Sequence, residues 1–246
     1  GKDFIVAHPD CDQRALTVAL LRGAFEFQGQ KCSAASRAYI PESVWNSIKD
    51  EYCGEVAKIR IGDPRDFSNF MSAVIDRKSY DNIVGYIERA REDPGCEIVT
   101  GGTYDDKTGY FIDPTTIICK DSRYETMAEE IFGPVLSIHV YPDEDFERIL
   151  EVCDSTSEYA LTGSIFATDR RHIETAARAL RFSAGNFYIN DKPTGAVVGQ
   201  QPFGGARGSG TNDKAGSPLN LLRWVSPRSI KETFAPPHDW TYGFLN

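Results

Sequence analysis

Residues 135–190 read VLSIHVYPDEDFERILEVCDSTSEYALTGSIFATDRRHIETAARALRFSAGNFYIN, and this stretch decides the fold. Two amphipathic stretches with helical spacing, Glu144–Cys153 and Arg170–Leu180, separate short apolar runs that are typical of buried strands. The three strands expected here are Val135–Tyr141, Gly163–Ala167 and Asn186–Asn190. Strands that alternate with helices predict an α/β fold in which the helices connect parallel strands.

The same alternation extends toward the N-terminus. We expect a strand at 4–7, and a helix that Asp10 or Asp12 caps and that ends near Phe27. Pro41 suits the first position of a further helix, because a proline lacks the N–H that has no helical partner there. The remaining elements expected are a strand at Ser33–Ile40, a helix from about Ala73 to Arg91, and strands at Glu97–Thr100 and Tyr110–Ile118. Together they predict a twisted, largely parallel sheet flanked by helices.

The composition is that of a globular chain and disfavours several classes of protein. Among the 246 residues, 27 Lys and Arg stand against 36 Asp and Glu, so the formal net charge is -9. This acidity disfavours a nucleic-acid partner, which needs a basic surface. No apolar run approaches the ~18 residues of a membrane-spanning helix, so no membrane partner is expected. The six cysteines are scattered without a CxxC pair, so neither a metal site nor a disulfide framework is expected.

Cys32 is the first candidate for chemistry, because it lies between a long predicted helix and a strand. Gly29 allows close approach of a substrate or of backbone, and the charge of Lys31 favours a thiolate. The alternative is a buried structural cysteine, which is the common role of a free thiol. The other five cysteines have apolar neighbours and are expected to be structural.

Two further stretches carry polar groups suited to binding. Glu130 and Phe132 precede a Gly-Pro turn and could present a carboxylate and a ring together; the alternative is a capped turn before the next strand. Gly195-Ala196 lies in a glycine-rich loop whose N–H groups could bind a carboxylate, with Ser33 as a further donor. The alternative there is a loop that only needs positive φ angles. The four histidines are isolated in sequence, so a Cys-His hydrolase also stays open.

Taken in order, several motifs resemble the aldehyde dehydrogenase superfamily. Its nucleophile motif is similar to Gly29–Cys32, and its nicotinamide-ribose motif is similar to Glu129–Val135. Further family blocks resemble Gly163–Phe166, Asn186–Asn190 and Pro202–Gly205. The resemblance covers essentially the whole chain and implies the catalytic domain of that superfamily.

A narrower resemblance is to the Δ1-pyrroline-5-carboxylate dehydrogenase (glutamate-γ-semialdehyde dehydrogenase) family of the eukaryotic, mitochondrial type. The residues that carry it are Cys32-Ser33, Thr194–Ala196, Gln201–Ala206, Gly210–Lys214 and Ser229–Thr233. This resemblance implies NAD-dependent oxidation of glutamate semialdehyde to glutamate in proline catabolism, in the mitochondrial matrix. Alternatives are a dehydrogenase for another semialdehyde, a standalone thiol hydrolase and a non-catalytic assembly module.

The resemblance also implies a role for each site residue. Cys32 would attack the aldehyde, and Glu130 and Phe132 would hold the nicotinamide half of NAD. The α-carboxylate of glutamate semialdehyde, the small-molecule partner, would bind Ser33, Gly195 and Ala196, while Phe203 would pack on its aliphatic stem. No metal is implied.

The expected organisation follows from the same resemblance. Residues 1–217 would form the catalytic domain, and residues 218–246 a C-terminal oligomerisation segment of a homo-oligomer, a dimer. Within that segment, Trp224–Phe234 is predicted to be a strand that pairs with another subunit. The Rossmann domain, the general-base glutamate and the oxyanion asparagine of the family would lie before Gly1, so the isolated chain is expected to be inactive.

Overall fold

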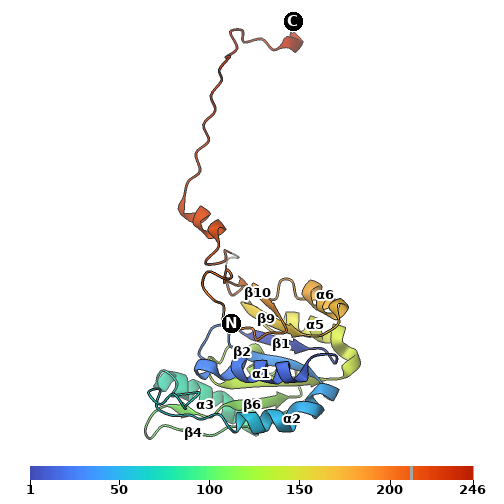
Figure 1. The fold of residues 1–246 in the computed structure, drawn as a ribbon, viewed down its shortest axis with the longest axis vertical. Helices are drawn as coiled ribbons and strands as arrows, with labels where there is room; N and C mark the ends of the chain where they lie inside the picture. Colours follow the sequence, from blue (N-terminus) through green and yellow to red (C-terminus); the bar gives the residue numbers. More distant parts are fainter. Residues whose placement is uncertain (211–212, 246) are drawn as a thin grey trace.

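The computed structural model describes residues 1–210 and 213–245, and its centre is a seven-stranded sheet (Figure 1). The strand order is β10-β9-β1-β2-β7-β6-β3, and only β3 runs antiparallel to its neighbour, β6. The strands are β1 (Asp3–Ala7), β2 (Ala35–Pro41), β3 (Cys96–Thr100), β6 (Thr115–Cys119), β7 (Val135–Tyr141), β9 (Thr162–Phe166) and β10 (Asn186–Ile189). The predicted α/β class and largely parallel sheet are confirmed.

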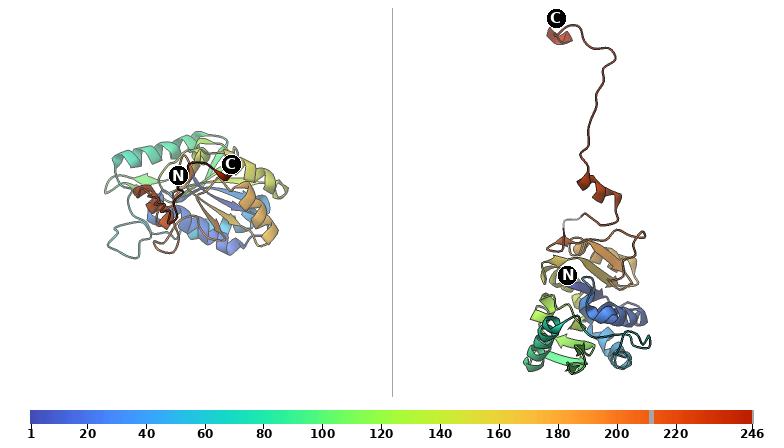
Figure 2. Two further views of the ribbon diagram at one scale, coloured as in Figure 1. Left: turned by 90° about the horizontal axis from the view of Figure 1, so that it is seen from above. Right: turned by 90° about the vertical axis from the view of Figure 1, so that its left-hand side faces the viewer.

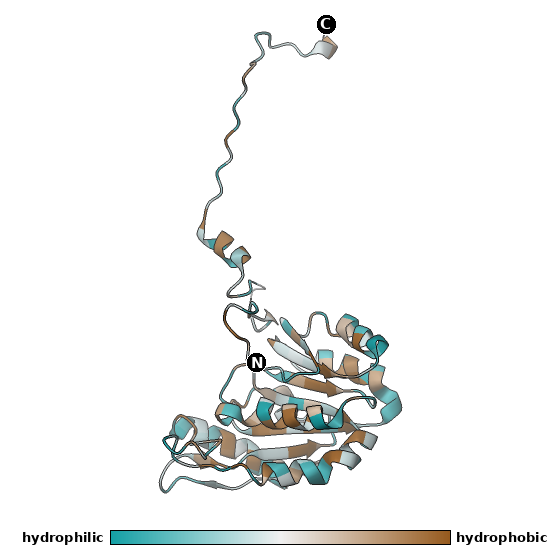
Figure 3. Ribbon diagram, viewed as in Figure 1, coloured by the Kyte–Doolittle hydropathy of each residue, from teal (hydrophilic) through white to brown (hydrophobic). Residues whose placement is uncertain are grey.

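Helices cover both faces of the sheet (Figure 2). In β1, Phe4 and Val6 belong to one apolar cluster, while Ile5 and Ala7 belong to the other, because successive side chains of a strand point to opposite faces. α1 (Gln13–Phe25) and α2 (Glu42–Val56) pack on the second face. The first face is covered by α3 (Arg77–Glu92), α5 (Phe146–Ser155) and α6 (Arg170–Ala179). Figure 3 accordingly shows largely apolar strands between amphipathic helices.

Most element boundaries agree with the sequence, and the differences have local causes. Asp12, and not Asp10, caps α1 by accepting a hydrogen bond from the N–H of Ala15. Pro41 precedes its helix as the cap residue and does not open it. The helix expected from Ala73 begins only at Arg77, where the Asp76 side chain accepts from the N–H of Ser79.

Several short elements were not expected. The predicted strand Tyr110–Ile118 is split at Asp113-Pro114 into β5 (Phe111–Ile112) and β6, and β5 pairs with β4 (Tyr104–Asp105). β8 (Tyr159–Ala160) pairs with β11 (Ala206–Arg207), which holds the glycine-rich loop against the domain. The others are α4 (Glu125–Ala128) and the 3-10 turns η1 (Glu26–Gly29), η2 (Asp143–Asp145), η3 (Pro218–Trp224) and η4 (Gly243–Leu245).

The C-terminal segment leaves the domain and runs away from it (Figure 1). Trp224 ends η3, and within the described residues no strand forms over the predicted Trp224–Phe234, because no neighbouring strand lies beside it. Its apolar side chains are exposed, with Ile230 at 79% and Phe234 at 90%. The strand predicted at Trp224–Phe234 is therefore not confirmed in the single chain. Among the described residues, no helix is long and apolar enough to cross a membrane.

Candidate active site

Cys32 lies on a turn that the preceding residues hold in an unusual conformation. After α1, Phe27, Gln28 and Gly29 all have left-handed φ angles of 57°, 57° and 62°. A Cβ on Gly29 would collide with the carbonyl group of Gly133, so glycine lets this turn pack directly on the segment before β7. The turn places Cys32 at the surface, three residues before β2. The alternative of a buried structural Cys32 is therefore wrong.

A cavity of about 790 Å³ opens at Cys32 and collects most of the predicted site residues. Its lining contains Cys32, together with Ser33, Phe132, Gly195, Ala196 and Phe203. These residues come from three places far apart in sequence: the turn before β2, the segment before β7 and the loop after β10. Tertiary structure thus brings the nucleophile candidate and the glycine loop to one cavity.

Ser33 joins the two sides of this cavity. Its side chain is buried, and its Oγ lies 2.8 Å from Oγ1 of Thr194, in a hydrogen bond in which either oxygen can be the donor. When Thr194 donates, the Ser33 hydroxyl keeps its own proton for another acceptor. The contact therefore fixes the loop beside the nucleophile and leaves Ser33 one donor for a ligand.

The glycine loop has the backbone freedom that the sequence analysis required. Gly195 is exposed, with a φ of 95° that favours glycine. Further along, Phe203 forms a pair of backbone hydrogen bonds with Ala215, of 2.9 and 2.8 Å. The Asn186 side chain donates to the carbonyl of Pro202 and accepts from the N–H of Gly204. These contacts hold the Phe203 ring at the cavity. Thr211 and Asn212 of the family motif lie outside the described residues.

Phe132 lies at the Cys32 cavity, and Glu130 lies in an adjoining cleft. Phe132 has a φ of 59°, is 44% exposed, and lines both the main cavity and a smaller cleft that Glu130 also lines. The carboxylate of Glu130 contacts the amino group of Gly1. The structure thus places the Phe132 ring at the Cys32 cavity and the Glu130 carboxylate in the smaller cleft beside it.

The charge of Lys31 is already paired. Its Nζ lies 3.1 Å from Oε2 of Glu26, and Nζ of Lys192 lies 3.2 Å from the same oxygen. Burial by itself would raise the pKa of Glu26, but the hydrogen bonds from the two lysines outweigh it, so the pKa is lowered. The sequence reasoning treated Lys31 as a free charge beside the thiol and missed Glu26 and Lys192, because no local motif connects residues 26 and 192.

The other cysteines differ from Cys32 in burial. Desolvation raises the pKa of each, to about 12 for Cys11, Cys96 and Cys153, and upward also for Cys53 and Cys119. A thiol with a raised pKa is a poor nucleophile at neutral pH, because little thiolate forms. The expected structural role fits all five.

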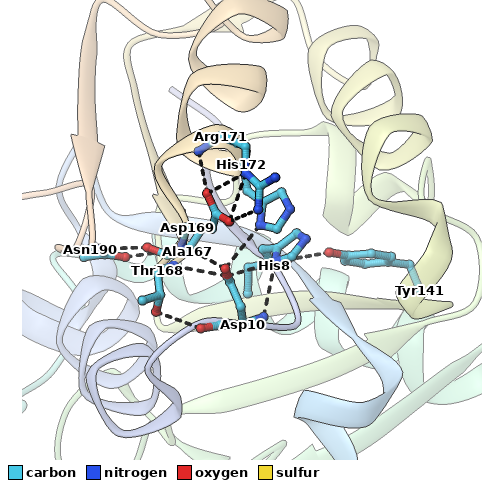
Figure 4. A network of polar contacts seen from close by, with 10 residues as sticks. His8, Asp10, Tyr141, Ala167, Thr168, Asp169, Arg171, His172 and Asn190 are labelled. Atoms are coloured by element: carbon cyan, nitrogen blue, oxygen red, sulfur yellow. Dashed lines mark hydrogen bonds and ion pairs between the residues drawn. The ribbon is translucent and has the colours of Figure 1, made fainter.

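Among the described residues, no histidine lines the Cys32 cavity. Two of the four instead meet at the opposite end of the sheet, where His8 follows β1 and His172 lies in the first turn of α6 (Figure 4). Their rings stack with centroids 3.7 Å apart. Nδ1 of His8 lies 2.8 Å from one oxygen of Asp10, and Nδ1 of His172 lies 3.2 Å from the other. Sequence reasoning missed this cluster because His172 lies 162 positions from Asp10 along the chain.

The His8, Asp10 and His172 side chains have the ligand types of a metal site, but Nδ1 of each histidine and both Asp10 oxygens already make hydrogen bonds. One Asp10 oxygen accepts from the N–H of Thr168 at 3.1 Å, and the other from the N–H of Asp169 at 2.8 Å. Asp10 therefore binds the loop that begins α6 to the loop that begins α1. This arrangement explains the cluster as a clamp between two loops (Figure 4).

The fold and the cavity together define a class: an α/β domain in which an accessible thiol and a glycine-rich loop line one cavity. A model of the aldehyde dehydrogenase family matches residues 1–230. The chain belongs to that family.

Two curated relatives show how similar the chain is to other members of the family. The mitochondrial delta-1-pyrroline-5-carboxylate dehydrogenase of Dictyostelium discoideum is 58% identical over 245 residues. The human protein of the same name is 50% identical over 246 residues. In both cases the match covers 100% of this chain and 44% of the relative, so the chain spans less than half the length of these relatives.

Solved structures give the same picture. The delta-pyrroline-5-carboxylate dehydrogenase from Mycobacterium tuberculosis bound with NAD superposes with a TM-score of 0.89 at 55% identity, over 99% of this chain and 44% of that one. The 1-pyrroline-5-carboxylate dehydrogenase from Thermus with bound NAD has a TM-score of 0.82 at 36% identity, over 91% and 42%.

Proposed function

We propose that this chain carries the catalytic thiol of an NAD-dependent dehydrogenase that oxidises L-glutamate γ-semialdehyde, formed from Δ1-pyrroline-5-carboxylate, to L-glutamate in proline catabolism. The observation that carries the proposal is the cavity in which Cys32 faces Ser33 and the Gly195-Ala196 loop. An aldehyde that also bears a carboxylate needs a nucleophile at one end and donors at the other. The relatives named above support this substrate.

Cys32 performs the covalent chemistry in this proposal. Its thiolate attacks the aldehyde carbon to form a thiohemiacetal, and the N–H of Cys32 donates to the developing oxyanion. Loss of hydride from that carbon gives a thioester. Water then hydrolyses the thioester, releasing the product carboxylate and the free thiol.

The carboxylate end of the substrate binds opposite the thiol. The N–H groups of Gly195 and Ala196 and the hydroxyl of Ser33 donate to it, and Thr194 orients that hydroxyl. Hydrogen bonds to a charged group contribute about 1.5–3 kcal/mol each. Phe203, on the cavity wall, packs against the aliphatic stem.

The residues beside Cys32 fit a nicotinamide nucleotide. Phe132 is exposed at the junction of the main cavity and the smaller cleft, where it limits the positions of a flat ring. Glu130, in the smaller cleft, offers a carboxylate for ribose hydroxyls. When bound, NAD accepts the hydride that the substrate carbon loses.

The proposal extends to organisation and location. Residues 1–217 form the catalytic domain, and residues 218–246 form a segment through which subunits associate as a homo-oligomer, a dimer. Support comes from the exposed apolar side chains after residue 218. A mitochondrial location is supported by relatives whose names include it, and the matrix is the compartment proposed.

Ser33→Ala tests the carboxylate site, in a chain that spans the full length of the relatives. The substitution removes a donor to a charged group, so kcat/KM for glutamate semialdehyde should fall by about 1.5–3 kcal/mol of transition-state stabilisation, roughly 10- to 150-fold. An uncharged aldehyde of similar length should lose much less. Thr194→Val is the matched variant, because it removes only the partner that orients Ser33. Equal losses for both aldehydes would show that Ser33 supports the shape of the cavity instead.

Two other activities share the same thiol. A semialdehyde of different length, such as the succinic type, would use the same donors, and a panel of semialdehydes decides between the substrates. Because Cys32 is exposed, the chain could also hydrolyse activated esters. Esterase activity without NAD that Cys32→Ala abolishes would support that second activity.

A further inference from the structure

One carboxylate, Glu26, holds two ammonium groups at the edge of the active site. Oε2 of Glu26 accepts from Nζ of Lys31 at 3.1 Å and from Nζ of Lys192 at 3.2 Å. The three side chains are only 21–29% exposed, so water screens their charges less than at an open surface. Formally, the cluster carries one excess positive charge.

The two lysines belong to the two sides of the Cys32 cavity. Lys31 precedes the nucleophile and lines the cavity. Lys192 lies behind the glycine loop: its Nζ donates to the carbonyl of Thr194 at 3.2 Å, and a Cβ built on Gly195 would lie 2.9 Å from it. Glu26 therefore joins the nucleophile turn to the glycine loop that lines the other side of the cavity.

The loop reaches this position by packing along α1. Gly23 of α1 leaves room for it, since a Cβ there would lie 3.6 Å from both the Lys192 Cβ and the Pro193 Cδ and 3.0 Å from the Cβ of Ala35. Pro193 and Thr194 are buried, whereas Gly195 is exposed. The loop is thus fixed up to Thr194 and presents its next residues to the cavity.

We propose that Glu26, Lys31 and Lys192 form a charge cluster that makes the Cys32 cavity select electrophiles bearing a carboxylate, with Glu26 and Lys192 as positioning residues. Glu26 keeps two like charges close together, and the excess charge attracts an anion to the glycine loop. Lys192 acts through that loop and does not line the cavity itself. The identity of the natural substrate rests on the proposed function. The preference of the Cys32 cavity for electrophiles that bear a carboxylate can be measured independently of that function.

The test compares alkylation of Cys32 by iodoacetate and by iodoacetamide in the 246-residue chain. The two reagents differ chiefly in the carboxylate, and both react with the same thiolate, so changes in the pKa or exposure of Cys32 cancel in the ratio of their rates. Mass spectrometry of the peptide that contains Cys32 gives both rates. The ratio of the iodoacetate rate to the iodoacetamide rate reports how strongly the cavity attracts an anion.

Lys192→Met should lower this ratio about three- to tenfold, because the cluster then loses the excess positive charge that attracts the anionic reagent in a partly screened site. Glu26→Gln should raise the ratio by a similar factor, because both ammonium groups then lose their counterion. Lys192→Arg keeps the charge and should hold the ratio near the wild-type value. The matched controls are Lys58→Met and Glu55→Gln, which remove the partners of an exposed ion pair at the end of α2 and should leave the ratio unchanged.

Two results would overturn the inference. One is a Lys192→Met ratio equal to that of Lys58→Met, and the other is a Glu26→Gln ratio that falls. Thermal melting identifies a variant that fails to fold; Lys31→Met, which removes the other ammonium group of the cluster and should also lower the ratio, then carries the comparison. If the ratio behaves as expected but glutamate semialdehyde is not oxidised by a full-length chain, the proposed function fails and the charge cluster stands.

Discussion

At the scale of single residues, the difference between Cys32 and the other thiols is one of environment. All six cysteines carry the same thiol group, and in the sequence only their neighbours distinguish them. Cys32 is exposed because three consecutive left-handed residues turn the chain outward before β2. The others lie in or beside the apolar clusters, where burial raises their pKa values.

We therefore expect Cys32 to be the first thiol modified by limiting iodoacetamide at pH 7. Each unit by which burial raises a thiol pKa lowers its thiolate fraction about tenfold, so the buried thiols should react far more slowly. Peptide mass spectrometry after a short exposure measures the site of labelling. Faster labelling of Cys53 or Cys96, the two half-buried thiols, would contradict the assignment of Cys32 as the nucleophile.

At the scale of elements, buried polar contacts connect strands and helices that the apolar pattern alone would leave free to shift. Arg37 of β2 is only 1% exposed. Its guanidinium donates to the carbonyl of Lys2 beside β1 at 3.0 Å and to the carbonyl of Cys153 in α5 at 3.2 Å. It also donates to the hydroxyl of Tyr39, which in turn donates to Thr156. One side chain thus ties three elements together.

Replacing Arg37 with Met should lower the free energy of unfolding by about 1–3 kcal/mol for each buried acceptor that loses its donor. Urea denaturation measures the change. Arg148→Met is the control, since Arg148 is exposed and pairs with Asp145 on the surface, where the loss should be below about 1 kcal/mol. Equal losses in the two variants would show that the Arg37 contacts contribute no more than a surface ion pair.

The clamp between the loops before α1 and α6 should make stability depend on pH. Desolvation is the main cause that lowers the pKa of His8 from its usual 6.5, and the stacked His172 also lowers it, while Asp10 and Asp169 act in the opposite direction. For Asp10, burial raises the pKa, but hydrogen bonds from Asp169, Thr168, His8 and His172 outweigh it and lower the pKa. Below pH 6.5 the unfolded state therefore takes up a proton at residue 8 that the folded state resists, so stability is lost as the pH falls.

Melting temperatures of wild type and His8→Phe between pH 7.5 and pH 5, at intervals of about half a unit, test this expectation. The wild type should lose stability relative to the variant as the pH falls through 6.5, because phenylalanine keeps a ring at this position and has no proton to bind. His238→Gln serves as the control, since His238 lies in the exposed C-terminal segment. If the melting temperature of the wild type rises relative to that of the variant as the pH falls, protonated His8 pairs with Asp10 and the expectation is wrong.

At the scale of the whole molecule, the C-terminal segment is the part that the domain leaves without a partner. No side chain of residues 218–245 is buried, although the segment contains Trp224, Val225, Ile230 and Phe234. Apolar side chains in an extended segment tend to pair with a sheet edge on another chain. The right-hand view of Figure 2 shows the segment extending away from the domain.

Removing residues from Val225 onward should shift a full-length chain toward monomer in sedimentation equilibrium, because the segment that we propose to pair with another subunit is lost. A chain that ends at Pro237 keeps this segment and is the matched control. An oligomer that survives truncation at Val225 would place the subunit contact elsewhere.

The sequence by itself determined the fold class, the order of the main elements and the position of the nucleophile candidate. These depend on local periodicity, caps and the glycine turn at Gly29, which neighbouring residues specify directly. Tertiary structure alone decided that Ser33 meets Thr194, that Glu26 binds both Lys31 and Lys192, and that His8 stacks on His172. The physical reason is that these contacts join residues up to 166 positions apart, and only packing of the loops along α1 and the sheet brings them within hydrogen-bond distance.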